Sequence, residues 1–365
     1  MEVLLLAAAI AVAFANGAND NAKGVATLLG AGILGRRSAI AWANLTTLAG
    51  SLAAVLLAGA LVRRFTGKGL VPETVVADPV FLTAVAAGAA ATVLVATRFG
   101  VPISTTHALT GALVGSGTAL AGPASVSYAT LGTGFFAPLL LSPLLSLSIA
   151  AVGYSFFRRL RLRLGVSEET CVCVDPVPDL AVAGAGTRIP MARLRVSVCE
   201  TCEKPRGRLG LRIGTLPVLN GVHVLSAGAV GFARGLNDTP KIAALLALGS
   251  LAGAPAIALV AGAMAVGGLL ATRRVATTMA WRITGMNEGQ AASANFVTAA
   301  LVAVASPLGL PVSTTHVSCG ALFGIGAVTG EARWRTIGGI FAAWVVTLPL
   351  AAALAAAVAL SLGSR

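Results

Sequence analysis

The chain has 365 residues, of which 56% are hydrophobic and only 11% are charged, and its formal net charge is +13. Soluble domains carry about 25% charged residues, so this composition excludes an ordinary soluble enzyme. Several apolar runs exceed the roughly 20 residues that a bilayer-spanning helix needs. The longest runs cover residues 39–62, 131–157, 245–271 and 337–362. The sequence therefore predicts an all-α, polytopic membrane protein.

The 26 lysines and arginines do not indicate a nucleic-acid partner. Many stand in pairs at the ends of apolar runs, as Arg36–Arg37 and Arg273–Arg274 do, and others gather between residues 158 and 214. Positive charge distributed in this way is typical of residues that set membrane topology.

Two motifs occur twice, in the same order. Phe14-Ala-Asn-Gly-Ala-Asn-Asp-Asn-Ala-Lys23 matches Phe232-Ala-Arg-Gly-Leu-Asn-Asp-Thr-Pro-Lys241 at six of ten positions. The segment from Gly100 to Gly115 matches the segment from Gly309 to Gly324 at ten of sixteen. We infer a duplicated chain with a first transmembrane repeat at 1–157, a linker at 158–214 and a second repeat at 215–365.

The linker is too polar to span a membrane, so we place it in the cytoplasm. Arg36–Arg37 follows the first helix of repeat one, whereas the corresponding turn of repeat two carries no charge. This difference predicts opposite orientations, that is, inverted repeats. A re-entrant helical hairpin in each repeat would be compatible with that topology. Gly111 and Gly115, like Gly320 and Gly324, have the spacing of close helix packing.

Asp20 and Asp238 lie inside otherwise apolar stretches, and each follows Gly-x-Asn. An ionised carboxylate in lipid is costly, so these residues should face a cavity or a partner. Broken helices with such ligands hold sodium ions in secondary transporters. The alternative is a buried aspartate that pairs with the nearby Lys23 or Lys241 only for packing.

Hydroxyl groups cluster after Pro102 and Pro311, which are suited to start a helix. Free backbone N–H groups at a helix N-terminus, together with hydroxyls, form a site for a tetrahedral oxyanion. Simple helix capping is the alternative. The candidate anion-binding residues are Ser104, Thr105, Thr106, Ser313, Thr314 and Thr315.

His107 and His316 close these two motifs. A proton relay is one interpretation, and a neutral histidine that hydrogen-bonds the hairpin backbone is the other. His223 has no counterpart in the other repeat and is interpreted as structural.

The linker contains four of the five cysteines. Two close pairs are compatible with a structural zinc site, with a redox pair or with no role; disulfides are not expected in a reducing cytoplasm. The four candidate ligands are Cys171, Cys173, Cys199 and Cys202.

The paired motifs resemble the inorganic phosphate transporter (PiT) family, which includes sodium/phosphate symporters. They read Gly17-Ala-Asn-Asp-Asn-Ala-Lys23, Gly235-Leu-Asn-Asp-Thr-Pro-Lys241, Pro102-Ile-Ser-Thr-Thr-His107 and Pro311-Val-Ser-Thr-Thr-His316. The resemblance implies a homodimer with inverted repeats, two hairpins that meet at phosphate, and cation-coupled uptake. By position, it assigns phosphate to the six hydroxyl residues and the coupling cation to Asn19, Asp20, Asn237 and Asp238.

Lys23 and Lys241 depart from the family, which usually has asparagine at both positions. Each ammonium group could replace a sodium ion or contact the anion, so sodium and proton coupling both stay open.

The sequence contains no nucleophile triad and no nucleotide-binding loop, so we expect a transporter in the cell membrane rather than an enzyme. A sulfate transporter is an alternative, because hydroxyl and amide donors suit both anions. A membrane sensor with the linker as its output is a more remote one.

Overall fold

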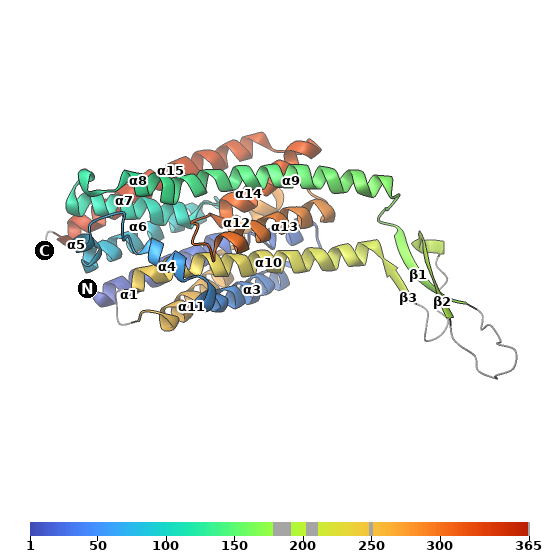
Figure 1. Ribbon diagram of the computed structural model, residues 1–365, viewed down its shortest axis with the longest axis horizontal. Helices are drawn as coiled ribbons and strands as arrows, with labels where there is room; N and C mark the ends of the chain where they lie inside the picture. Colours follow the sequence, from blue (N-terminus) through green and yellow to red (C-terminus); the bar gives the residue numbers. More distant parts are fainter. Residues whose placement is uncertain (178–190, 202–210, 248–250, 364–365) are drawn as a thin grey trace. The chain divides into compact units, whose positions relative to one another are not determined.

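The computed structural model describes residues 1–177, 191–201, 211–247 and 251–363 (Figure 1). It divides into a helical unit, formed by 1–154 and 224–365, and a smaller unit at 155–223. In the described residues, seven helices are long and apolar enough to cross a membrane.

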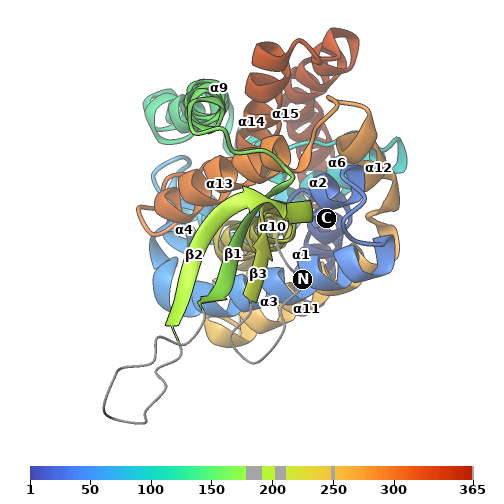
Figure 2. The same ribbon diagram turned by 90° about the vertical axis from the view of Figure 1, so that its right-hand side faces the viewer.

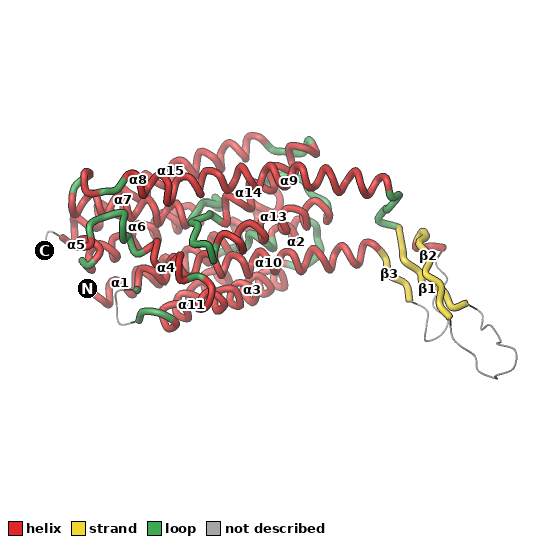
Figure 3. The backbone as a smooth tube through the Cα atoms, viewed as in Figure 1, coloured by secondary structure: helices red, strands yellow, loops and turns green. Residues whose placement is uncertain are grey.

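Helices occupy nearly all of the described chain outside the linker (Figure 3). Those of the first repeat are α1 (Glu2–Asp20), α2 (Ala26–Gly30), α3 (Arg36–Leu57), α4 (Gly59–Phe65), α5 (Glu73–Val76), α6 (Pro79–Arg98), α7 (Thr105–Ala121), α8 (Tyr128–Leu131) and α9 (Ala137–Arg163). Those of the second repeat are α10 (Thr215–Ala243), α11 (Ala254–Ala271), α12 (Arg273–Trp281), α13 (Glu288–Ala305), α14 (Thr314–Thr329) and α15 (Trp334–Gly363).

Glycines bring helices of the two repeats into backbone contact. A Cβ atom at Gly17 of α1 would collide with the carbonyl of Met264 in α11, and one at Gly235 of α10 would collide with the carbonyl of Thr47 in α3. Only glycine permits such a close approach of two helix backbones. The first long helix of each repeat therefore packs on the second long helix of the other, α1 on α11 and α10 on α3.

The predicted close packing at Gly111, Gly115, Gly320 and Gly324 is confirmed. The first two face the backbone of α15, near Leu348 and Ala352, and the other two face the backbone of α9. The last long helix of each repeat thus packs on the helix that carries the second motif of the opposite repeat, α15 on α7 and α9 on α14.

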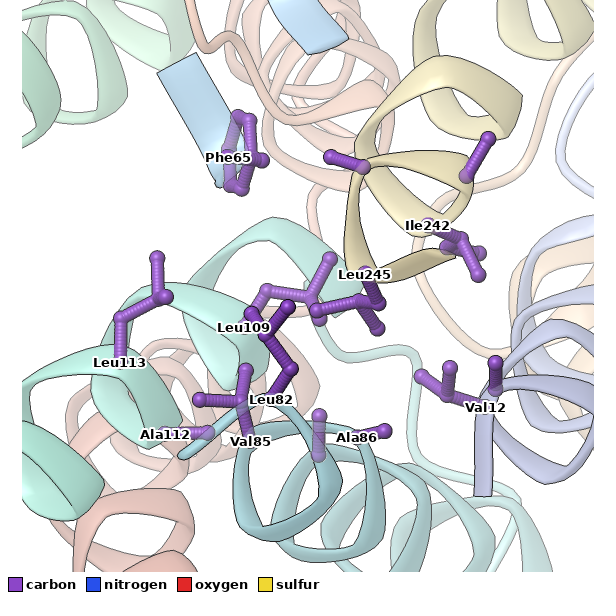
Figure 4. Close-up of a cluster of buried hydrophobic side chains, with 14 of the residues drawn as sticks. Val12, Phe65, Leu82, Val85, Ala86, Leu109, Ala112, Leu113, Ile242 and Leu245 are labelled. Carbon is purple, nitrogen blue, oxygen red and sulfur yellow. The ribbon is translucent and has the colours of Figure 1, made fainter. Parts of the chain in front are cut away.

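The main apolar cluster is also shared between the repeats (Figure 4). Val12 of α1, Leu82 of α6 and Leu109 of α7 are buried together with Ile242 at the end of α10. Figure 4 shows these side chains pointing toward one another from their helices. Burial of large aliphatic side chains against both repeats joins them into one core.

The two copies of the first motif differ in backbone structure. α1 ends at Asp20, as the predicted break requires, whereas α10 continues through Asp238 and Pro240 to Ala243. The break expected at Asp238 is therefore wrong in position. Pro240 has no N–H, so the helix loses one hydrogen bond there without ending.

The linker unit contains a three-stranded antiparallel sheet in the order β2-β1-β3, which the sequence did not predict (Figure 2). Its strands are β1 (Thr170–Val177), β2 (Met191–Val198) and β3 (Leu211–Gly214). Val172 of β1 pairs with Val196 on one side and with Ile213 on the other.

The zinc site is not supported. Cys171 and Cys199 form a disulfide, so neither offers the thiolate that zinc requires, and the described residues contain no group of metal-ligating side chains. Cys171 and Cys173 lie two apart on β1, which places both on one face of the strand. Cys202 lies outside the described residues.

Candidate functional site

The two aspartates and the starts of α7 and α14 converge inside the helical unit. Asp20 and Asp238 have exposed fractions of 1% and 3%. Thr105 donates a hydrogen bond from Oγ1 to Asp20 Oδ2 over 3.3 Å, and Thr314 donates one to Asp238 Oδ2 over the same distance. Each carboxylate therefore accepts a bond from the first turn of α7 or α14 in its own repeat.

The two lysines connect each repeat to the other. Lys23 Nζ lies 2.5 Å from Asp20 Oδ1 and also donates to the hydroxyl of Thr315. Lys241 Nζ lies 3.4 Å from Asp238 Oδ1 and donates to Thr106 Oγ1 over 2.8 Å. The predicted pairing of each lysine with the aspartate three residues before it is thus observed. The additional contact with the opposite hairpin was not predicted.

Backbone carbonyls just before α7 and α14 complete this arrangement. Thr315 Oγ1 donates to the carbonyl of Ile103 over 2.7 Å, and Lys241 Nζ donates to the carbonyl of Val312 over 2.7 Å. Ile103 and Val312 occupy the same place in the two copies of the second motif. An unwound α10 was expected to offer backbone carbonyls to the site. The carbonyls that accept hydrogen bonds here instead belong to the extended residues just before α7 and α14.

Asn19 and Asn237 bind the segments that lead into their own hairpin helices. Asn19 Oδ1 accepts from the Ile103 backbone over 3.1 Å, and its Nδ2 donates to Thr97. Asn237 Nδ2 donates to the Val312 carbonyl over 3.2 Å. In this structure both amides bond to the backbone just before α7 or α14. Their predicted cation ligation stays a prediction.

Ser104 and Ser313 are the N-cap residues of α7 and α14. Ser104 Oγ accepts from the His107 backbone N–H over 3.0 Å, and Ser313 Oγ accepts from that of His316 over 3.2 Å. This is the geometry of ordinary helix capping. The helices begin at Thr105 and Thr314, so Pro102 and Pro311 precede the caps and do not lie in the first turn.

His107 and His316 contact each other, edge to face, with ring centroids 4.3 Å apart. His316 also stacks against Trp344 of α15 at 3.9 Å, and Trp344 Nε1 donates to the Pro102 carbonyl. The two imidazoles thus bring α7 and α14 into contact close to their N-termini.

Arg234 is a site residue that the motif comparison did not single out. It is 1% exposed, and its Nε lies 3.8 Å from Asp238 Oδ2. Its guanidinium also donates to Asn16 Oδ1 over 2.6 Å, to Asn21 Oδ1 and to Thr47 Oγ1. The signal was present in the sequence, because Arg234 is a charged residue within a duplicated, apolar motif.

Asn16 is the counterpart of Arg234 in the first repeat. Its Nδ2 donates to Asp20 Oδ2 over 3.1 Å, to Thr105 Oγ1 over 3.0 Å and, more weakly, to Asp238 Oδ2 over 3.4 Å. A single amide thus touches both carboxylates. The site is therefore one connected network and not two separate half-sites.

A family model described as the phosphate transporter family matches residues 16–355. The chain is 28% identical to a protein named as a phosphate permease in Pyrococcus abyssi, over 97% of this chain and 96% of that protein. It is 29% identical to a protein named as a low-affinity inorganic phosphate transporter in Rhizobium meliloti, over 96% and 93%.

The fold is similar to that of a solved structure titled "The sodium-dependent phosphate transporter". The TM-score is 0.74 at 21% sequence identity, and the alignment covers 99% of this chain and 98% of the other. The family model spans both repeats and all four motifs, so the chain belongs to the phosphate transporter family.

Proposed function

We propose that the protein is a secondary transporter that takes up inorganic phosphate across a cell membrane, coupled to a cation gradient. The observation that carries this proposal is the meeting of threonine hydroxyls at two helix N-termini with three buried cationic side chains. Hydroxyls, free backbone N–H groups and the positive ends of helix dipoles together favour an oxyanion.

The anion would be held by Thr105, Thr106, Thr314 and Thr315, with Ser104 and Ser313 setting the start of each helix. Thr105 and Thr314 now donate to carboxylates, while Thr106 and Thr315 accept from lysines. An arriving anion would accept bonds from the same hydroxyls and ammonium groups. The site is therefore proposed to exchange internal partners for substrate as it loads.

The coupling cation is proposed to act at the two motifs that carry Asn19, Asp20, Asn237 and Asp238. Buried carboxylates inside a membrane domain are strong candidates for ion or proton sites. His107 and His316, in mutual contact behind the threonines, are proposed to modulate the movement of the hairpins.

Phosphate is favoured over sulfate by the same carboxylates. At neutral pH phosphate keeps at least one P–OH group, which donates a hydrogen bond, whereas sulfate has no donor. Asp20 and Asp238 can accept a hydrogen bond from the P–OH group. Opposite sulfate, a buried carboxylate oxygen would have no donor, which would weaken binding by about 1–3 kcal/mol.

The test is uptake of radiolabelled phosphate and sulfate into proteoliposomes that contain the purified protein, under imposed sodium or proton gradients. The variant with Thr105→Val and Thr314→Val should lose phosphate binding and uptake. The control carries Thr92→Val and Thr298→Val, which alter two buried threonines that bond to carbonyls of their own helices. Undiminished phosphate affinity in the first variant would contradict the proposed site.

We propose that the protein is a homodimer in the cell membrane and that its linker lies on the cytoplasmic side. We also propose that it has no catalytic activity. Membership of a transporter family supports transport over a sensor whose output is the linker.

A further inference from the structure

The buried charges of the site do not balance. In the described part of the chain, five charged side chains are less than 4% exposed: Lys23, Arg234 and Lys241 against Asp20 and Asp238. Three cations and two carboxylates leave one formal positive charge. An unpaired charge in a low-dielectric interior is costly, so the protein's own cations leave this site complementary to an anion.

The ammonium nitrogens contact the same kinds of oxygen atom that a sodium ion binds. Lys241 Nζ has three oxygen neighbours, from the Asp238 carboxylate, the Thr106 hydroxyl and the Val312 carbonyl. Lys23 Nζ has the Asp20 carboxylate and the Thr315 hydroxyl. Carboxylate, hydroxyl and carbonyl oxygens are the ligands that hard monovalent cations take in secondary transporters.

These ligands come from both repeats. Lys23 follows α1 and Lys241 lies in the last turn of α10, and each reaches the start of α14 or α7 in the other repeat. Each ammonium group therefore pairs with a buried aspartate of its own repeat and contacts a threonine of the other repeat.

Arg234 supplies a third permanent charge. Guanidinium keeps its proton inside proteins, and this one bonds to Asn16, Asn21 and Thr47 while facing Asp238. It thereby fixes one positive charge between the aspartates whatever the ionic composition outside.

We propose that Lys23 and Lys241 are built-in counter-cations that occupy the places of two sodium ions, so that anion binding by this chain does not require sodium. The inference rests on the proposed phosphate transport and deepens it. With asparagine at both positions, Arg234 and the two aspartates would leave one negative charge, and two monovalent cations would restore the present balance. A proton gradient is then the cation gradient that drives uptake.

The experiment measures phosphate binding and uptake by the purified protein in sodium chloride and in choline chloride. The wild type should show the same affinity and rate in both salts. The variant with Lys23→Asn and Lys241→Asn should lose about tenfold in affinity in choline, equivalent to about 1.4 kcal/mol, and should regain it in sodium with a sigmoidal response. Lys68→Asn, which makes the same change at an exposed lysine, should behave as the wild type.

Two outcomes overturn the inference. One is phosphate binding by the wild type that requires sodium, and the other is phosphate binding by the double variant that does not respond to sodium. Failure of the proposed function looks different, because the wild type would then bind no phosphate in either salt. If the double variant does not fold, Lys23→Asn alone should respond to sodium hyperbolically. Sodium should also raise the thermal unfolding temperature of that single variant and leave the wild type unchanged; no such difference would again reject the proposal.

Discussion

Arg234 and Asn16 stand at the same position of the two copies of one motif, and their side chains bond directly to each other, Nη2 to Oδ1, over 2.6 Å. Two arginines at these positions would repel each other, and two asparagines would leave the site without its third buried cation. The duplicated site has therefore become asymmetric at its centre.

Replacement of Arg234 with methionine should weaken phosphate binding and destabilise the protein. The change leaves Asp238 and Asn16 with fewer partners, and breaking a buried ionic contact costs about 3–5 kcal/mol. Thermal unfolding in detergent, together with phosphate binding, measures both effects. Arg335→Met, at an exposed position, is the control. Equal unfolding temperatures for the two variants would show that Arg234 does not contribute to the stability of the fold.

Asp20→Asn and Lys23→Met should each be strongly destabilising, and the double variant should be less destabilised than the sum of the two. Each single change leaves one buried charge unpaired, whereas the double change removes both. A cycle of unfolding free energies should yield a coupling of at least about 1 kcal/mol. The same cycle at exposed Lys68 and Glu73 should be additive.

Asp20→Asn and Asp238→Asn should each abolish the response of uptake to an imposed cation gradient. The described membrane core contains no other buried carboxylate to accept the charge. Counterflow of phosphate without any gradient separates loss of coupling from loss of substrate binding. If uptake by both variants still responds to the gradient, neither aspartate is the coupling site.

Gly115→Ala should destabilise the protein or lower its yield. The added Cβ would press into the backbone of Ala352 in α15, where a flexible side chain is not available to give way. Gly338→Ala is the matched control, since a Cβ there meets open space and helix propensity favours alanine by about 1 kcal/mol. The two variants should therefore shift the unfolding temperature in opposite directions.

A cysteine at position 161 reports the side on which the linker lies. Arg161 is exposed at the end of α9, and the native cysteines are first replaced by serine. A membrane-impermeant maleimide should label Arg161→Cys in inside-out vesicles and not in right-side-out vesicles. The reverse pattern would place the linker outside the cell, in an oxidising environment in which the Cys171–Cys199 disulfide is stable.

The sequence predicted what depends on composition and local spacing. Membrane helices, the pairing of Lys23 with Asp20 and the helix starts at the hydroxyl motifs all follow from apolar length, helical periodicity or turn chemistry, and the structure has them. It also places the glycines of the second motif at close helix crossings, as their spacing indicated.

The rest depends on contacts between residues far apart in the chain. Nothing local to Lys241 shows that its ammonium group reaches Thr106, and nothing local to Arg234 shows that Asn16 lies opposite. The sheet and the disulfide of the linker were missed for a similar reason, because strand pairing and the state of a thiol depend on distant partners. The Gly-x-Asn-Asp motif suggested a helix break at Asp238, but α10 continues to Ala243.

The exchange of packing partners between repeats has a consequence for biosynthesis. α1 and α3 enter the membrane before α11 and α10, their glycine-mediated partners, have been translated. During that interval Asp20 and Lys23 lack the start of α14, but they can pair with each other, because only two residues separate them on the chain. Such a local ion pair would lower the cost of placing the two charges in the bilayer before the second repeat encloses them.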